Sequence, residues 1–330
     1  LETAEDYLVG SMADLYVVGD TIVVVDGQKA RQIFLFDLDG KFLSKIGNVG
    51  TGPGEYASIT YASATSENIS IRDWLTAKYI SYDYSGNVLG EIEFSRTSPA
   101  RVMPQGDGVL LATYASYYES DPFALQWLEG DSVVATALPY TIKRAEIAPE
   151  MFRLGENEIG LTIPMNDTIY SITGRHIVPK FTLGLISEDE ALEWKIKSAK
   201  MDVLEKQKYR LQNHDVPADF ISVHPGQDYY IIGFQMGMTP YIAVVDKKTL
   251  KSRSYLRSSR NPITLYLPPY IKSINGNTLV GYMSDDYFHM VPDEARAFVD
   301  KYFSSQDQEL LKDYDYDNNN PIVWLMDLKQ

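Results

Sequence analysis

Residues 20–56 read DTIVVVDGQKARQIFLFDLDGKFLSKIGNVGTGPGEY and contain three short apolar runs, at 22–25, 33–36 and 42–46. β-Branched and aromatic residues dominate these runs, which is typical of β-strands. Turn-forming residues separate them, since Asp26-Gly27 follows the first run and the sequence DLDG at 37–40 follows the second. Such residues favour tight reversals between antiparallel strands. The segment therefore predicts an antiparallel meander.

The same unit recurs along the chain. Val25-Asp26 is matched by Arg72-Asp73, 47 positions later, and the turn glycine at position 40 is matched by glycines at 86, 130 and 174. Less regular copies follow at 241–246 and 270–282, the last of them completed by 322–326. A period of about 45 residues with about four strands is typical of a β-propeller blade. We therefore predict an all-β fold, a six-bladed β-propeller, and keep two unrelated β-sandwiches as the alternative.

The repeat also predicts the domain organisation. Nothing in the sequence resembles an interdomain linker, so residues 1–330 are expected to form one domain. A closed ring of blades requires its last blade to be sealed, because an open sheet edge invites pairing with other chains. Since the sixth copy lacks a clear fourth strand, we expect residues 1–10 to add an edge strand beside it.

Two insertions with helical patterns interrupt the repeat, near 187–215 and 291–312. The first opens with a capping box, Ser187 and Glu190. Its apolar residues at helical spacing are Leu192, Ile196, Ala199 and Val203. In the second, Pro292 is suited to the first turn of a helix. An apolar stripe follows, formed by Ala295, Phe298, Val299 and Phe303, and Ser305 predicts a second cap.

Both insertions are expected on one face of the propeller. Connections after the second and fourth strands of a blade emerge on the same side, as do the loops at Asp26 and Asp73 and those at 47–54 and 114–121. Elaborated loops on a rigid scaffold commonly bind ligands. A second interpretation, which we weigh equally, is that the helices cover exposed core.

The composition excludes several classes of function. The net charge is −15, which is unfavourable for binding phosphate backbones or anionic lipid. The absence of cysteine excludes disulfides and thiolate metal sites. No stretch approaches the 18–20 apolar residues, roughly, of a membrane span. Because the chain begins at Leu1 rather than Met, we expect that an upstream segment has been removed.

Motifs for common active sites are incomplete. None of the four histidines pair at metal-ligand spacing. The acidic run at 313–318 lacks the glycine and glutamate of a calcium loop. The glycine-rich segment 50–54 does not precede a predicted helix, as a phosphate-binding loop would, and no Gly-x-Ser-x-Gly elbow is present. We therefore predict no cofactor and no resident metal.

The first blade resembles a known family. Its residues 37–43, 46–47 and 52–56, with Leu1-Glu2-Thr3 at the start and 320–323 near the end, are similar to NHL-like six-bladed β-propeller proteins common in Bacteroidetes. The similarity is specific in the first blade and at both ends, and only architectural at 100–282. It implies an exported protein, often a lipoprotein, at the periplasm or cell surface, in a family mostly without assigned activity.

We therefore favour a non-catalytic binding or scaffold protein that holds a peptide, glycan or partner protein on its elaborated face. The predicted ligand-binding residues are Asp26, Arg72, Asp73, Tyr114, Tyr117, Met236, Tyr282, Asp286, Tyr287 and His289. The alternative is an enzyme, a metal-dependent hydrolase or lactonase similar to the gluconolactonases. That alternative needs several carboxylate and amide side chains on one cation, and Asp26, Asp73 and Asp286 are its nearest candidates.

Overall fold

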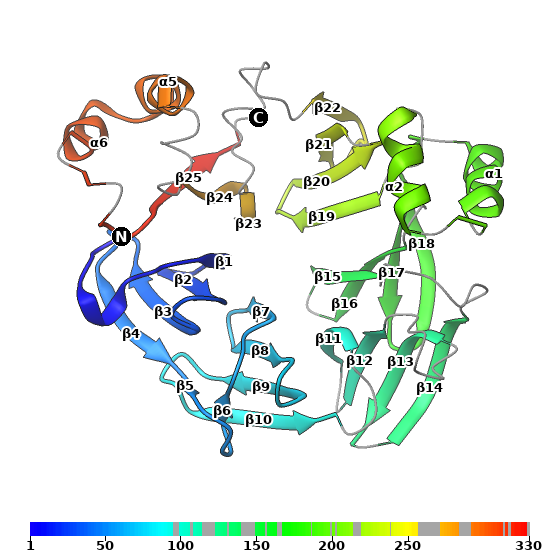
Figure 1. The fold of residues 1–330 in the computed structure, drawn as a ribbon, viewed down its shortest axis with the longest axis horizontal. Helices are drawn as coiled ribbons and strands as arrows, with labels where there is room; N and C mark the ends of the chain where they lie inside the picture. Colours follow the sequence, from blue (N-terminus) through cyan, green and yellow to red (C-terminus); the bar gives the residue numbers. More distant parts are fainter. Residues whose placement is uncertain are drawn as a thin grey trace. The chain divides into compact units, whose positions relative to one another are not determined.

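The computed structural model of the chain describes residues 1–94, 99–105, 108–113, 123–130, 132–139, 149–155, 157–163, 167–185, 187–198, 200–201, 203–213, 219–237, 239–256, 271–283, 292–312, 314–315 and 318–328. The described chain is mostly β-strand, and six sheets form the blades of a β-propeller, as predicted (Figure 1). Contacts group the chain into two compact units. Unit 1 comprises Leu1–Glu93 and Ser258–Gln330, and unit 2 comprises Phe94–Arg257. A single domain stays a prediction.

Unit 1 contains three antiparallel blades. The first blade is β1 (Met12–Val18), β2 (Thr21–Asp26), β3 (Gln32–Asp37) and β4 (Phe42–Ile46). The second is β7 (Tyr61–Ala64), β8 (Ile69–Asp73), β9 (Lys78–Tyr82) and β10 (Val88–Glu93). The last is β23 (Ile271–Asn275), β24 (Thr278–Met283) and β25 (Ile322–Asp327). A short parallel pair, β5 (Asn48–Val49) and β6 (Glu55–Tyr56), lies in the connection between the first two blades.

Unit 2 contains the other three blades, each four-stranded and antiparallel. The third blade is β11 (Pro99–Gln105), β12 (Gly108–Thr113), β13 (Phe123–Glu129) and β14 (Ser132–Pro139). The fourth is β15 (Glu150–Gly155), β16 (Glu158–Thr162), β17 (Thr168–Thr173) and β18 (His176–Thr182). The fifth is β19 (Asp219–Pro225), β20 (Tyr229–Met236), β21 (Thr239–Asp246) and β22 (Ser252–Leu256). The turn glycines at 130 and 174 directly follow β13 and β17, and the predicted copy at 241–246 lies in β21, so the repeat placed the third strands of these blades correctly.

The turn after the third strand is built alike in the first two blades. Asp37 accepts a hydrogen bond from the backbone N–H of Lys41, and Asp83 accepts one from that of Asn87, both at 2.8 Å. Gly40 and Gly86 have φ values of 79° and 86°, a region that favours glycine because it lacks a Cβ. This shared geometry explains why these turns carried the clearest repeat signal.

The core of unit 1 explains the continuous apolar run in β2. Val23 and Val25 pack in one cluster with Ile71 and other residues of the second blade. Their neighbours in sequence, including Val24, point the other way and pack in a cluster with Val280 of the last blade. Because β2 is buried on both sides, its residues are apolar without alternation.

The prediction that residues 1–10 form an edge strand of the last blade is wrong for the described residues, where that sheet has three strands. The segment instead contains a single 3₁₀ turn, Glu5–Tyr7. The fully buried side chain of Asn320 holds it, because its amide donates to the carbonyls of Glu2 and Tyr7, at 2.6 and 3.0 Å, and accepts from the N–H of Val9 at 2.6 Å. The two ends of unit 1 therefore meet through side-chain hydrogen bonds.

In the residues that the structure describes, the first insertion forms two helices, α1 (Glu188–Ser198) and α2 (Val203–Gln212), between β18 and β19. The predicted capping box is confirmed, since Ser187 Oγ accepts from the N–H of Glu190 and Glu190 accepts from the N–H of Ser187. The apolar spacing from Leu192 to Val203 spans two helices, because a tight turn, in which Met201 N–H donates to the Ser198 carbonyl, ends α1.

The described residues of the second insertion also include two helices, α5 (Pro292–Tyr302) and α6 (Ser305–Leu310), which lie between β24 and β25. Pro292 begins α5, as predicted. The predicted cap is one residue out, since Ser304 caps α6 in a capping box with Asp307. Gln308, which would complete a box with Ser305, instead donates to the Phe303 carbonyl at 3.0 Å. Among the described residues, no helix has the length and apolar content to cross a bilayer.

Candidate functional site

Asp26, at the end of β2, is a fully buried carboxylate bound by backbone donors. Its Oδ2 accepts from the N–H groups of Gly10 and Ser11, at 2.7 and 2.9 Å. Its Oδ1 accepts from those of Gln28 and Lys29, at 3.1 and 2.9 Å. The side chain therefore ties the start of the first blade to the turn between β2 and β3.

Asp73 has the same position in the second blade, at the end of β8, and is also fully buried. It accepts from the N–H groups of Ala57, Ser58 and Leu75 at 2.6–3.1 Å, and from the hydroxyls of Ser58 and Thr76, both at 2.5 Å. Burial would raise the pKa of Asp73, but these hydrogen bonds outweigh it and lower the pKa. The carboxylate is therefore charged at neutral pH.

These contacts bear on the predicted hydrolase. In both blades the carboxylate oxygens already receive at least four hydrogen bonds from this chain. Asp286, the third candidate ligand, lies outside the described residues. No group of three or more His, Asp or Glu side chains suited to a metal occurs in the described part of the chain. Nothing in this geometry favours a metal centre over a structural role for the two aspartates.

Beside Asp73, the turn between β8 and β9 presents an exposed apolar pair. Trp74 is 53% exposed and Leu75 is 69% exposed. The side chain of Arg72 is buried, and its guanidinium carbon lies 5.2 Å from the centre of the Trp74 ring, a cation–π distance. The sequence analysis missed Trp74 and Leu75, although two large apolar residues directly after a strand-ending Asp were a visible signal.

Side chains of the second blade also fix the glycine-rich connection at 47–54. Lys78, which is nearly buried, donates to the Gly52 carbonyl at 2.9 Å and forms a 2.8 Å ion pair with Glu91. Glu91 in turn accepts from the N–H of Gly54 at 2.5 Å. Hydrogen bonds from Lys78 and Gly54 lower the pKa of Glu91. The loop is held by polar contacts to β9 and β10.

Other predicted site residues have different surroundings. Tyr282 is buried in the core of unit 1, and its hydroxyl donates to the Met12 carbonyl at 3.2 Å. Met236, in unit 2, packs beside the core cluster that contains Phe234. The residues outside the described part of the chain are Tyr114, Tyr117, Asp286, Tyr287 and His289. Of the predicted set, the structure thus brings Arg72 and Asp73 together, and ligand binding by any member stays a prediction.

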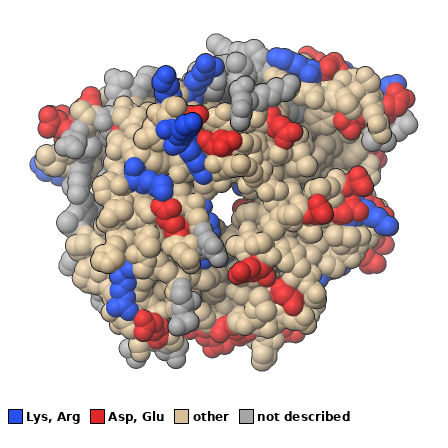
Figure 2. All heavy atoms as spheres, turned by 180° about the vertical axis from the view of Figure 1, so that it is seen from behind, with Lys and Arg blue, Asp and Glu red and all other residues tan. Residues whose placement is uncertain are grey.

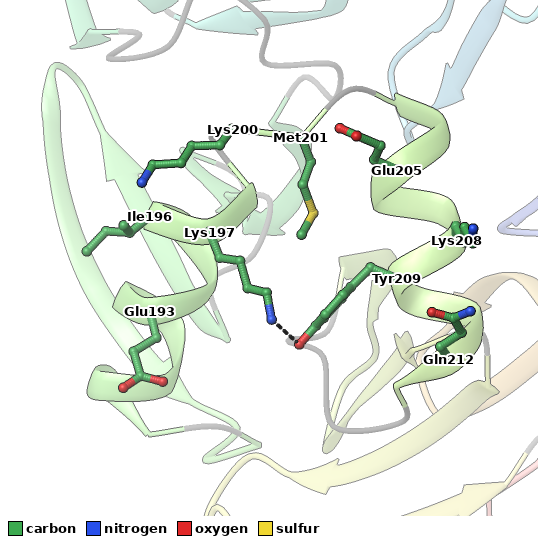
Figure 3. A pocket seen from close by; sticks show the side chains of 9 residues that line it. All are labelled: Glu193, Ile196, Lys197, Lys200, Met201, Glu205, Lys208, Tyr209 and Gln212. Atoms are coloured by element: carbon green, nitrogen blue, oxygen red, sulfur yellow. Dashed lines mark hydrogen bonds between the residues drawn. The ribbon is translucent and has the colours of Figure 1, made fainter.

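A second surface lies in unit 2, between α1 and α2 (Figure 3). It is an open pocket of about 730 Å³, lined by Glu193, Ile196, Lys197, Lys200, Met201, Glu205, Lys208, Tyr209 and Gln212. Lys197 reaches across the gap and donates to the Tyr209 hydroxyl at 2.8 Å. The Tyr209 ring stacks on the buried Trp194, with ring centres 5.2 Å apart. These contacts hold the two helices together as a hairpin.

Positively and negatively charged side chains are mixed on the face of the molecule drawn in Figure 2. Figure 2 shows Lys and Arg interspersed with Asp and Glu on one face of the molecule. A nucleic-acid footprint would require basic side chains gathered in one patch. The absence of a nucleic-acid partner nevertheless stays a prediction.

Solved structures resemble this chain along nearly its whole length. A Bacteroides fragilis NCTC 9343 protein described as a "Putative exported protein" is 17% identical, with a TM-score of 0.76, and the match covers 100% of this chain and 94% of that one. A member of the DUF4221 family from Bacteroides vulgatus ATCC 8482 is 10% identical, with a TM-score of 0.56, and the match covers 98% of this chain and 95% of that one. At these identities the likeness shows the fold alone.

Curated proteins give no match to the chain. The resemblance to NHL-like proteins therefore stays a prediction, while the six-bladed fold that it implied is confirmed. One family model, described as "Domain of unknown function (DUF4934)", matches residues 1–327. The chain belongs to this DUF4934 family.

Proposed function

We propose that the chain is a non-catalytic binding protein that holds a peptide segment of a partner protein on the β8–β9 turn. The observation that carries this proposal is the exposure of Trp74 and Leu75 on a turn fixed by Asp73. Tryptophan is enriched among the residues that dominate binding energy at interfaces. An adjacent exposed leucine favours an apolar peptide side chain over a sugar ring as the second contact.

The proposed turn is preorganised. Asp73 accepts from the N–H of Leu75 and from the Thr76 hydroxyl, and Ser58 Oγ accepts from the N–H groups of Trp74 and Leu75. The Arg72 guanidinium lies against one face of the indole ring. Because these contacts fix the backbone and the ring before binding, little conformational entropy is lost when a ligand docks.

A peptide-display library screened against the whole chain tests this proposal. Trp74→Ala is expected to weaken the binding of the selected peptides by about 10–100-fold, because it removes an aromatic anchor. The matched control is Tyr302→Ala, since Tyr302 is an exposed aromatic on α5, and it should leave binding unchanged. A Trp74→Ala protein that binds the selected peptides as tightly as the wild type would count against the proposal. A peptide library that gives no binder, together with a parallel glycan array that does, would also count against it.

We also propose that the protein acts outside the cytoplasm, at the periplasm or cell surface. The support is the whole-length likeness to a Bacteroides fragilis protein described as a "Putative exported protein", together with the family resemblance noted for the first blade. Fractionation of the native host with antibodies against the chain tests this location. Recovery of the protein in the cytoplasmic fraction alone would contradict it.

A further inference from the structure

The α1–α2 hairpin exposes apolar side chains that its own unit does not cover. Leu192 and Ile196 on α1 are 55% and 56% exposed, and Leu204 and Leu211 on α2 are 75% and 62% exposed. Residues three, four and seven apart lie on the same side of a helix. Each helix therefore carries an exposed apolar stripe, and the stripe of α1 faces away from the buried Trp194 of the same helix. Four large apolar side chains on two short helices form a patch of the kind that marks an interaction surface.

The charges along α1 indicate what could cover this patch. Exposed acids, including Asp189 and Glu193, lie in the first half of α1, while Lys197 lies near its end and Lys200 lies in the turn that follows it. On α2, Glu205 and Lys208 are both exposed and line the same pocket, one charge of each sign. When two copies of α1 pack antiparallel, the acidic half of each meets the basic end of the other. The face is thus complementary to itself, which is the requirement for a two-fold interface.

We infer that the α1–α2 hairpin is a self-association surface, on which the hairpin of a second copy of this chain packs about a two-fold axis. The four helices form an antiparallel bundle that buries Leu192, Ile196, Leu204 and Leu211 between the copies. The open groove between α1 and α2 receives side chains of the other hairpin (Figure 3). The Lys197–Tyr209 hydrogen bond keeps each hairpin rigid before association.

The dimensions of the hairpin set the expected strength. Helices of 11 and 10 residues are each about 15 Å long. Two such helices per copy give an interface at the small end of the range for stable complexes, so the dissociation constant is expected to be about 1–100 µM. The association is therefore a dimerisation that depends on protein concentration.

Sedimentation velocity of the whole chain, from about 1 to 300 µM, tests the inference across that range. The wild type is expected to shift from the monomer mass toward twice that mass. Ile196→Glu combined with Leu204→Glu should stay monomeric with an unchanged melting temperature, because both side chains are exposed. The control is Leu89→Glu, an exposed leucine on β10, which should dimerise like the wild type. A wild type that is monomeric throughout, or a double variant that still dimerises, overturns the inference.

A charge-swap experiment tests the two-fold arrangement. Lys200→Glu with Lys208→Glu makes the face acidic, and Asp189→Lys with Glu193→Lys makes it basic. Each variant alone should dimerise at least about tenfold more weakly, because like charges then face each other. An equimolar mixture should recover the wild-type constant to within about threefold. A mixture no stronger than its components would overturn the arrangement, as would either variant dimerising like the wild type.

Discussion

Asp26 and Asp73 perform the same task in adjacent blades. Each ends the second strand, is fully buried, and accepts backbone N–H groups from the following turn and from the residues that precede the first strand. Unpaired backbone donors in a buried connection are costly, and a carboxylate satisfies several of them at once. At this scale the repeat is a recurring hydrogen-bonding arrangement as well as a sequence pattern.

The lowered pKa of Asp73 predicts how its contribution to the stability of the fold depends on pH. A carboxyl group whose folded pKa lies below its unfolded value stabilises the protein above the unfolded pKa, and this stabilisation is lost as the pH falls through the folded pKa. Asp73→Asn should lower the free energy of unfolding by about 1–3 kcal/mol at pH 7, since backbone donors then face an amide. The difference from wild type should narrow below about pH 4.

Urea unfolding of both proteins at pH 7, 5, 4 and 3 measures this difference. Asp20→Asn serves as the control, because Asp20 is an exposed turn residue, and it should have little effect at pH 7. A difference between wild type and Asp73→Asn that stays constant from pH 7 to 3 would show that the charge of Asp73 does not stabilise the turn.

Residue roles were harder to predict from the sequence than residue positions. The match between Val25-Asp26 and Arg72-Asp73 correctly placed both aspartates at strand ends. An aspartate at a loop gives the same signal whether it binds a ligand or backbone amides, because both tasks require a carboxylate. Only the folded structure reveals that backbone N–H groups surround these two carboxylates.

At the scale of elements, the glycine-rich connection at 47–54 depends on backbone conformation and close packing. Gly54 has a φ of 70°, and a Cβ at this position would lie 2.5 Å from Cγ2 of Val88 on β10. Its N–H donates to Glu91, and its carbonyl accepts from the Tyr82 hydroxyl at 2.9 Å. Any larger residue here must therefore disturb the anchoring of the loop.

Gly54→Ala is expected to lower the free energy of unfolding by about 1–3 kcal/mol, through the positive φ and the contact with Val88 together. Adding Val88→Ala should recover part of this loss by removing the contact, while the conformational cost remains. Gly90→Ala is the matched control, because no atom lies within 4 Å of its added Cβ, and it should change stability by less than about 1 kcal/mol. Chemical denaturation of the four proteins measures these differences, and a Gly54→Ala protein as stable as wild type would contradict the expectation.

For the helices, the sequence reveals the position of the element but not the direction that its apolar stripe faces. Helical spacing and capping residues correctly placed helices in both insertions. Spacing alone does not tell which side an apolar stripe faces, and Leu192 and Ile196 face solvent while Trp194 is buried. The tertiary environment decides the orientation, so the exposed face of the hairpin became visible only in the structure.

At the scale of the whole molecule, the fold was predictable because blades repeat at a nearly constant interval. Each blade is a meander of neighbouring strands, so its turns leave regular marks in the sequence. The way in which the ends meet was not predictable, because it depends on the side chain of Asn320 rather than on a strand. One residue among 330 carries too little pattern to be distinguished from the other asparagines.

Asn320→Ala should loosen this junction. It leaves the carbonyls of Glu2 and Tyr7 and the N–H of Val9 without their buried partner, at an expected cost of about 2–4 kcal/mol. Hydrogen exchange should accelerate at Val9 and in β25, while amides of β15–β18, in the other unit, keep their protection. Asn319→Ala is the control and should leave exchange unchanged, whereas equal protection of β25 in wild type and Asn320→Ala would contradict the assigned role of Asn320.

The Asn320 junction also affects biosynthesis. Val9 leaves the ribosome 311 residues before the side chain that binds it, a delay of about 15–60 s at usual translation rates. During that interval Glu2, Tyr7 and Val9 lack their final partner, and this segment of the nascent polypeptide is open to chaperones. Completion of unit 1 therefore awaits the synthesis of Asn320.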